Sequence, residues 1–347
     1  MKKLKVAVVG LTTGAGHTAN YVESGDVGEV VICDINEDKL KEIGDKHNIT
    51  KRYTDYGRML AEEKPDAVSV TVPNFLHLPF TVKALEAGAH VLCEKPMAKN
   101  TAEATEMQRC AEKHDKKLMI NFNQRFQKEV LTLKSVIDRG DLGDIYFVRT
   151  AWQRRRGVPW WYPLANGLTT CGGGALIDLG VHVLDRAMWL CGFPTPEWVL
   201  GNTYSKLSHN EAASRGIDPF EVEDMAVAMI RMTNGLMLQL EASWAGNREN
   251  EMIMTRIYGT RGGAVLKSVV KPNRERYNKL FLEKDGELHD YDIDSDFDNP
   301  PGNIRQAFLD AIVNNTPVPC APWQGIQINK ILDAVYKSAA SGAPVKF

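Results

Sequence analysis

The stretch Val6-Ala7-Val8-Val9-Gly10-Leu11-Thr12-Thr13-Gly14-Ala15-Gly16-His17 decides the fold of the first part of the chain. Four consecutive apolar residues are typical of a strand that is buried on both faces of a parallel sheet. The glycine-rich turn that follows allows backbone N–H groups to approach a pyrophosphate at the start of a helix. The stretch therefore predicts a strand, a turn and a helix that together bind a dinucleotide.

The turn matches the dinucleotide fingerprint G-x-G-x-x-G/A only in part. Gly10 fits the first position and Ala15 the third, whereas Thr12 occupies the second. We expect Gly14 and the following Gly16 to supply the missing backbone freedom. The candidate cofactor-binding residues of the turn are Gly10, Thr12, Thr13, Gly14 and Ala15. A tight turn with a purely structural role is the alternative interpretation.

Asp34 strengthens the dinucleotide interpretation, because it ends the second apolar run at the position of the acid that binds the adenosine ribose. Its negative charge would repel the additional phosphate of NADP, and the next two residues, Ile35 and Asn36, include no arginine to neutralise that phosphate. The sequence therefore predicts NAD as cofactor, in preference to NADP. The alternative is that Asp34 is the N-cap of the next helix.

The first 122 residues alternate between apolar runs and helical patterns, which predicts a doubly wound α/β Rossmann domain over residues 1–122. The other apolar runs are Val30–Cys33, Ala67–Val72, Val91–Cys93 and Leu118–Ile120. The helical patterns are Glu37–His47, Tyr56–Glu62, Pro79–Ala87 and Thr101–His114. Gly88 is a candidate C-cap and Asn100 a candidate N-cap.

Residues 123–347 have a different pattern, which predicts an α+β domain with a large, mostly antiparallel open sheet for substrate binding and oligomerisation. The predicted strands are Ile145–Gln153, Asp224–Met232, Leu236–Trp244, Met252–Tyr258 and Lys279–Glu283. Asn234-Gly235 is a strong hairpin signal between two of them. The predicted helices are Ala175–Leu190, Asn303–Asn314 and Trp323–Ser341. The pattern leaves open whether the last helices pack on the first domain.

The composition excludes several classes of function. The chain has 347 residues and a net charge of −2, so it has no global attraction to nucleic acid or to an anionic membrane. No apolar run reaches the roughly 18 residues of a membrane span. The six cysteines are scattered without the spacing of a zinc site, so we expect no metal and reduced thiols in the cytoplasm.

Two later motifs are more specific: Cys93-Glu94-Lys95-Pro96 and Gly172-Gly173-Gly174-Ala175-Leu176-Ile177-Asp178-Leu179-Gly180-Val181-His182. Together with Val72-Pro73-Asn74, with Asn123-Gln124-Arg125-Phe126 and with Asp333-Ala334-Val335-Tyr336-Lys337-Ser338, they resemble the Gfo/Idh/MocA family of glucose-fructose oxidoreductases and inositol dehydrogenases. The resemblance covers nearly the whole chain. It implies a Rossmann domain, an open-sheet domain that supports a homodimer or homotetramer, and hydride transfer between a nicotinamide and a sugar or cyclic polyol.

The chemistry requires a base for the hydroxyl proton and a donor for the developing alkoxide. Lys95 follows the end of a strand, where Rossmann ligands bind, and it can donate to the substrate oxygen as a compact charge. Asp178 and His182 are four residues apart on a predicted helix and share a face. We assign His182 as general base, Lys95 as alkoxide stabiliser and Asp178 as substrate anchor. The sequence leaves open how Lys95 and His182 divide these roles. A solvated Lys95 and a structural His182 are the alternatives to this assignment.

Further candidates have weaker support. The resemblance places Asn74, His77 and Glu94 at the cofactor, and Arg125 at the substrate. The alternatives are that Asn74 only forms a turn and that His77 only begins the next helix. Trp160 belongs to an aromatic and basic cluster with Trp152-Gln153-Arg154-Arg155-Arg156 and Trp161-Tyr162, which could face a sugar or form a core or interface. The run Gly172–Gly174 permits close approach to a ligand or is a flexible helix entry. Asp185 is a possible structural partner of Arg186.

The sequence therefore predicts an NAD-dependent dehydrogenase that acts on the hydroxyl of a sugar or cyclic polyol. Two alternatives remain at this point. One is a glycoside-cleaving relative that retains NAD and works by transient oxidation, with the same lysine and histidine. The other is a sensor of ligand or dinucleotide without catalysis, against which the intact set of Lys95, Asp178 and His182 argues.

Overall fold

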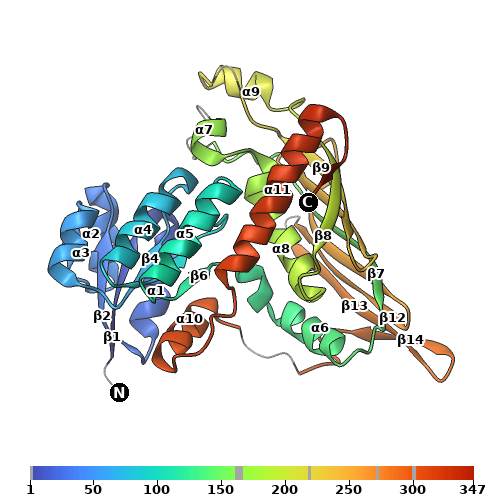
Figure 1. Ribbon diagram of the computed structural model, residues 1–347, viewed down its shortest axis with the longest axis horizontal. Coiled ribbons are helices and arrows are strands. Elements are labelled where there is room, and N and C mark those ends of the chain that lie inside the picture. Colours follow the sequence, from blue (N-terminus) through green and yellow to red (C-terminus); the bar gives the residue numbers. More distant parts are fainter. Residues whose placement is uncertain (1–2, 161–166, 218–219, 271–272, 299–301) are drawn as a thin grey trace. The chain divides into compact units, whose positions relative to one another are not determined.

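The computed structural model describes residues 3–160, 167–217, 220–270, 273–298 and 302–347, and it divides the chain into two compact units. Unit 1 comprises residues 1–122 and 303–329, and unit 2 comprises residues 123–302 and 330–347. The long helix α11 (Pro322–Ser341) contributes residues to both units. Figure 1 shows this helix in red near the end of the chain.

Unit 1 is built on a six-stranded parallel sheet in the order β3-β2-β1-β4-β5-β6, the strand order of a dinucleotide-binding Rossmann domain. The strands are β1 (Leu4–Val9), β2 (Val27–Cys33), β3 (Arg52–Tyr53), β4 (Ala67–Val70), β5 (His90–Cys93) and β6 (Leu118–Ile120). The last four residues of β1 and all of β4 and β6 are buried, as predicted for strands covered on both faces.

Helices flank this sheet (Figure 1). They are α1 (Leu11–Glu23), α2 (Glu37–Lys46), α3 (Tyr56–Glu63), α4 (His77–Glu86), α5 (Thr101–Lys113) and α10 (Ile304–Val313), with a short 3-10 turn, η1 (Asn74–Leu76), before α4. The predicted N-cap is confirmed, because Asn100 accepts a hydrogen bond from the backbone N–H of Glu103. The C-cap of α4 is Ala87, and Gly88 follows it with a φ of 89°. Helix α4 begins two residues before Pro79, because proline is tolerated in the first turn of a helix.

Unit 2 contains a nine-stranded sheet in the order β14-β13-β12-β11-β7-β10-β9-β8-β15, in which only β7 and β10 pair in parallel. The strands are β7 (Ile145–Gln153), β8 (Pro196–Tyr204), β9 (Met225–Met232), β10 (Met237–Ser243), β11 (Glu251–Gly259), β12 (Gly262–Val270), β13 (Arg274–Lys284), β14 (Glu287–Asp292) and β15 (Val345–Lys346). This confirms the predicted open, mostly antiparallel sheet. The Asn234-Gly235 hairpin is also confirmed, since it joins β9 to β10.

The helical segments of unit 2 are η2 (Asn123–Phe126), α6 (Lys128–Asp138), α7 (Gly167–Cys171), η3 (Leu176–Gly180), α8 (Val181–Leu190), α9 (His209–Ser214) and the end of α11. The predicted helix over 175–190 starts with a π-helical turn, η3, and continues as α8. Both pack on the sheet, where alternate residues of β9 are buried. In the part of the chain that the structure describes, no helix is long and apolar enough to cross a membrane.

Candidate active site

Gly10 forms the turn between β1 and α1. Its φ of 90° lies in the region that glycine adopts without strain, and a Cβ atom at this position would lie 2.7 Å from the carbonyl oxygen of Thr71. The Thr71 hydroxyl donates to the carbonyl oxygen of Gly10 at 2.6 Å. Thr12 and Thr13 are exposed in the first turn of α1, where a helix leaves N–H groups without partners inside the helix.

Gly14 has a different role from the one we predicted. It lies inside the regular helix α1, and so does Gly16, so neither supplies unusual backbone freedom. A Cβ atom at Gly14 would lie 2.6 Å from the Thr71 hydroxyl and 2.7 Å from Val8. Gly14, and not the half-buried Ala15, therefore provides the close contact between helix and sheet that the third glycine of the fingerprint provides.

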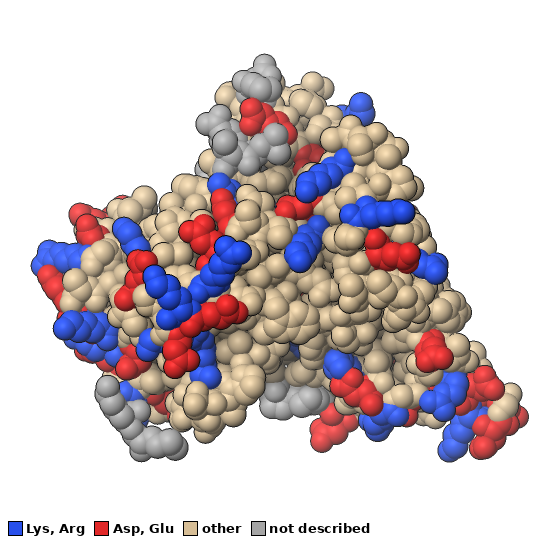
Figure 2. Space-filling view, viewed as in Figure 1, with Lys and Arg blue, Asp and Glu red and all other residues tan. Residues whose placement is uncertain are grey.

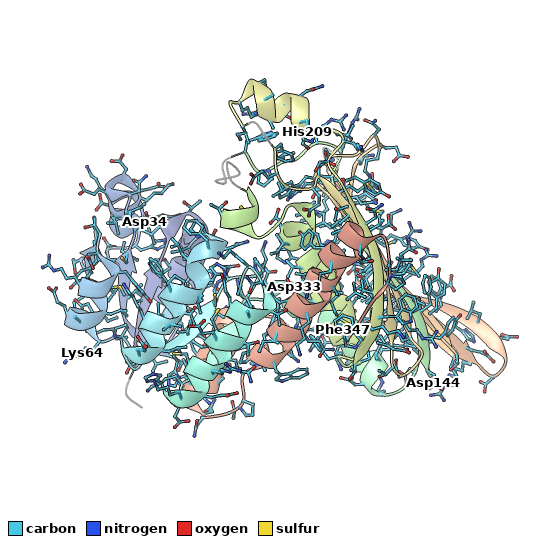
Figure 3. All side chains as sticks on the ribbon, turned by 45° about the horizontal axis from the view of Figure 1, so that its top comes forward. Asp34, Lys64, Asp144, His209, Asp333 and Phe347 are labelled. Atoms are coloured by element: carbon cyan, nitrogen blue, oxygen red, sulfur yellow. The ribbon has the colours of Figure 1, made fainter. Side chains whose placement is uncertain are left out.

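Asp34 follows β2 and faces the start of α1. One carboxylate oxygen accepts from the backbone N–H of Leu11 at 2.5 Å and the other from that of Asn36 at 2.9 Å. The alternative role as helix cap is wrong, because Asn36 caps α2 by accepting from the N–H of Lys39. The neighbouring Ile35 is 91% exposed, an unusual position for a large apolar side chain, and no sequence motif assigned it a role. Figure 3 labels Asp34 in unit 1.

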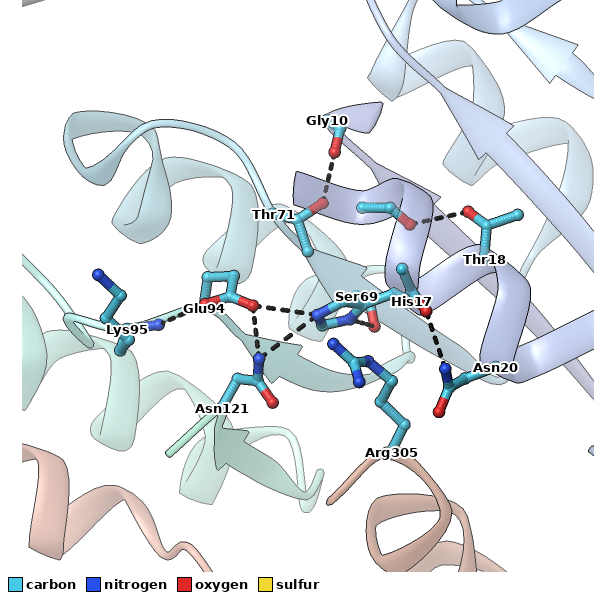
Figure 4. Close-up of polar contacts among 12 residues, drawn as sticks. Gly10, His17, Thr18, Asn20, Ser69, Thr71, Glu94, Lys95, Asn121 and Arg305 are labelled. Carbon is cyan, nitrogen blue, oxygen red and sulfur yellow. Dashed lines mark hydrogen bonds and ion pairs between the residues drawn. The ribbon is translucent and has the colours of Figure 1, made fainter. Parts of the chain in front are cut away.

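A buried polar network lies beside Lys95 (Figure 4). Glu94 accepts from His17 Nε2 at 3.0 Å and from the Asn121 amide at 2.5 Å, and its second oxygen accepts from the backbone N–H of Lys95 at 3.2 Å. The other ring nitrogen of His17 lies 3.1 Å from the Ser69 hydroxyl. The sequence predicted Glu94 and Lys95 but neither His17 of α1 nor Asn121 after β6, because local spacing does not relate residues on different elements.

The charges of this network follow from burial and hydrogen bonding. Burial lowers the pKa of His17, although Glu94 opposes the effect, so a neutral imidazole donates from Nε2. Burial raises the pKa of Glu94, but the hydrogen bond from His17, the charge of Lys95 and the Asn121 amide outweigh it and lower the value to about 2. An ionised carboxylate therefore lies next to Lys95.

His77 and Asn74 belong to the segment after β4. His77 is buried, and its ring nitrogens lie 2.8 Å from the carbonyl oxygen of Pro96 and 2.9 Å from that of Val72. It thus joins the loop that carries Asn74 to the loop that carries Lys95. The backbone occupies both polar atoms of the ring, so any contribution of His77 to cofactor binding acts through the position of these loops.

Asp178 and His182 are the only half-buried residues in the run from Gly173 to Met188, which is otherwise buried. Asp178 lies in the π-helical turn, a feature found often at functional sites, and accepts from Trp244 Nε1 at 2.8 Å. The ring of His182 lies 5.4 Å from that of Trp152. The two candidate catalytic side chains of unit 2 are thus partly exposed, and each of them contacts a tryptophan.

Arg125 is buried and donates through Nε and a terminal nitrogen to Asp185 at 2.9 and 2.5 Å. The suggested pairing of Asp185 with Arg186 is therefore wrong, since Arg186 donates instead to the hydroxyl of Thr255. These contacts give Arg125 a role inside the fold of unit 2.

Trp160 is half-buried and packs against the core cluster that contains Phe220, with the Arg215 guanidinium 4.9 Å from the centre of its ring. Trp161 and Tyr162 lie outside the described residues. Arg154 lies over Trp152 and donates to the carbonyl oxygen of Gly157. On the face seen in Figure 2, basic and acidic side chains are interspersed.

Known proteins resemble this chain over both of its units. A family model described as an oxidoreductase family with an NAD-binding Rossmann fold matches residues 4–122, and the C-terminal alpha/beta domain of the same family matches residues 134–347. D-glucoside 3-dehydrogenase of Escherichia coli (strain K12) is 32% identical over 351 residues, covering 99% of this chain and 97% of that protein. Myo-inositol 2-dehydrogenase of Thermotoga maritima is 26% identical and covers 81% of this chain and 86% of that protein. Among solved structures, an aldose-aldose oxidoreductase from Caulobacter crescentus complexed with glycerol has a TM-score of 0.82 at 25% identity, with all of both chains covered.

Proposed function

Because this chain belongs to the Gfo/Idh/MocA family of NAD-binding oxidoreductases, we propose that it is an NAD-dependent dehydrogenase that oxidises a secondary hydroxyl of a sugar ring. One observation carries the proposal: Asp178 and His182 are the partly exposed polar pair in the otherwise buried run from Gly173 to Met188. The relatives named above are dehydrogenases and an oxidoreductase, which favours hydride transfer over glycoside cleavage or ligand sensing.

The residues of unit 1 fit NAD. Gly10 leaves the start of α1 open to a pyrophosphate, which the N–H groups at Thr12 and Thr13 would bind. Asp34 would accept from the ribose hydroxyls, and its charge would disfavour the additional phosphate of NADP. The exposed Ile35 offers an apolar surface to the adenine. Ala15, Asn74 and Glu94 complete the proposed cofactor-binding set.

We assign the proton chemistry to three side chains. His182 takes the proton of the hydroxyl, because a histidine changes its charge most readily near neutral pH. Lys95 donates to the developing alkoxide, and the ionised Glu94 lies beside it. Asp178, held by Trp244, anchors a neighbouring hydroxyl of the substrate. NAD, when bound, accepts the hydride from the carbon that carries the hydroxyl.

D-glucosides are the first substrate class to test. The proposal follows the 32% identity with D-glucoside 3-dehydrogenase over nearly the full length of both chains. Trp152, which is half-buried beside His182, gives the site an aromatic surface. Such surfaces pack on the apolar faces of pyranose rings while polar groups bind the hydroxyls.

The proposal is tested by the absorbance of NADH when the protein and NAD are mixed with glucosides, inositols, aldoses and uronates. We expect NADH to accumulate with one class, and His182→Ala to lower kcat at least about 100-fold while the affinity for NAD is kept. A His182→Ala variant with the native rate would refute the mechanism. Cleavage of a glycoside without net NADH would show the glycoside-cleaving alternative.

We also propose that the chain forms a homodimer or homotetramer through the uncovered face of the large sheet. Leu200 of β8 and Met229 of β9 line an open hollow of about 600 Å³ on this sheet, together with Arg149 and Glu241. Leu200 is 43% exposed, so pairing with a second copy would bury apolar surface. Light scattering during gel filtration tests this, and a monomer at micromolar concentration would contradict it.

A further inference from the structure

The turn before the catalytic helix is held by one residue, Glu223. Its carboxylate accepts from the backbone N–H of Gly174 at 2.9 Å and from that of Leu176 at 2.7 Å. Its own carbonyl oxygen accepts from the N–H of Ala175, between them, at 3.1 Å. N–H groups at the start of a helix lack partners within the helix, so Glu223 satisfies three that would otherwise be buried without an acceptor.

Two of the three glycines in the motif make room for this arrangement. A Cβ atom at Gly174 would lie 2.0 Å from the carbonyl oxygen of Glu223, and one at Gly173 would lie 2.0 Å from the hydroxyl of Tyr336. These distances are far too short for any side chain. The glycines therefore allow close contact within unit 2, a role that differs from both roles considered from the sequence.

Tyr336 completes the arrangement from helix α11. Its hydroxyl donates to Glu223 at 3.0 Å, on the same carboxylate oxygen that accepts from Leu176. Glu223 is buried and Tyr336 is half-buried, and burial raises the pKa of Glu223 to about 7 despite its hydrogen bonds. A tyrosine hydroxyl can donate to a carboxylate or accept from a carboxylic acid, so Tyr336 is a suitable partner for either form.

The segment that Glu223 binds continues directly into the helix that carries Asp178 and His182. Asp178 is two residues after Leu176, and its backbone N–H bonds to the carbonyl oxygen of Gly174 at 3.1 Å. His182 follows one turn later on the same helix. We propose that Glu223, supported by Tyr336, is a positioning residue that fixes the start of this helix and thereby places Asp178 and His182 for catalysis. The inference rests on the proposed function of these two residues.

The test is the variant Glu223→Gln. Its amide keeps the shape of the carboxylate but replaces one acceptor by a donor, so the N–H of Gly174 or of Leu176 loses its acceptor. We expect kcat to fall about tenfold, which corresponds to about 1.4 kcal/mol, with the affinity for NAD unchanged. The amides over residues 174–178 should exchange hydrogen faster. Tyr336→Phe should have a smaller effect in the same direction.

Glu63→Gln is the matched control, because Glu63 is also a buried carboxylate with three hydrogen-bond donors, from Lys5, Lys51 and Tyr53, but lies in unit 1. It should lower stability without changing kcat of the folded protein. Native kcat in Glu223→Gln, or a loss of activity in both variants that only follows the folded fraction, would overturn the inference.

The proposed function and this inference can fail separately. If the wild-type protein oxidises no substrate, or if His182→Ala keeps the native rate, the proposed function fails. Hydrogen exchange at 174–178 still tests the positioning role in that case, and unchanged exchange in Glu223→Gln overturns it.

Discussion

At the scale of single residues, Glu94 and Glu223 show how different surroundings move the pKa of the same type of side chain in opposite directions. Burial acts on both and raises the pKa of each. Around Glu94, the hydrogen bond from His17 and the charge of Lys95 outweigh burial and lower the pKa to about 2. Around Glu223, the donors are backbone N–H groups and Tyr336, burial dominates, and the pKa rises to about 7. The nature of the partners therefore decides in which direction the pKa of each buried glutamate moves.

The pKa of Glu94 predicts how stability depends on pH. A pKa lowered from 4.5 to about 2 stabilises the folded state by up to about 3 kcal/mol. This contribution is complete above pH 4.5 and is lost as the pH falls toward about 2. Urea unfolding of wild type and Glu94→Gln should therefore show a difference in free energy of unfolding that shrinks below pH 4.5. A constant difference from pH 7 to pH 3 would contradict the ionised state.

Asp34 is predicted to determine both the affinity and the choice of cofactor. Asp34→Ala removes the acceptor for the ribose hydroxyls and the charge that repels NADP. We expect NAD to bind about 10- to 100-fold more weakly, and NADP to bind relatively better. Fluorescence titration with both dinucleotides measures this, with the exposed Asp38→Ala as control. An unchanged preference for NAD would refute the ribose assignment.

At the scale of elements, helix α1 offers two glycines for a matched test. Gly14→Ala places a methyl group 2.6 Å from the Thr71 hydroxyl and 2.7 Å from Val8, so α1 must move away from the sheet. We expect a loss of about 1 to 3 kcal/mol of stability and weaker binding of NAD. Gly16→Ala meets only the end of Arg305, at 3.9 Å, and should gain up to about 1 kcal/mol. Thermal unfolding that ranks the two variants in the opposite order would exclude the packing role of Gly14.

Elements could be predicted where local sequence determines them. The strands β1, β4, β5 and β6 are short apolar runs. Such runs are typical of strands that are buried on both faces of a sheet, so the sequence predicted them. By contrast, β8 begins at Pro196 and β12 begins with Gly262-Gly263, residues that usually end strands, so the sequence pattern predicted neither strand.

The candidate site could also be predicted only in part. Asp178 and His182 stand in one motif, whereas their partners Trp244 and Trp152 come from other parts of the chain, which no local spacing indicates.

At the scale of the whole molecule, unit 1 is completed by residues 303–329, far from 1–122 in the sequence. Phe308 and Leu309 of α10 are fully buried, and the backbone N–H of Ile120 in β6 bonds to the carbonyl oxygen of Cys320. The sequence left the docking of these helices open, because an amphipathic helix shows which face is buried but not against what. The stability of the NAD-binding unit therefore depends on a segment that carries none of its motifs.

This dependence can be tested with two phenylalanines near the end of the chain. Phe308→Ala leaves a cavity in unit 1 and should cost about 3 to 5 kcal/mol, whereas Phe347→Ala, at a residue 49% exposed, should cost less than about 0.5 kcal/mol. NAD binds only the folded unit, so at 100 times its Kd it should restore about 2.7 kcal/mol and recover much of the loss in Tm of Phe308→Ala. Calorimetry with and without NAD measures both effects. If Phe308→Ala unfolded a part of the molecule whose Tm did not respond to NAD, helix α10 would not belong to the cofactor-binding unit.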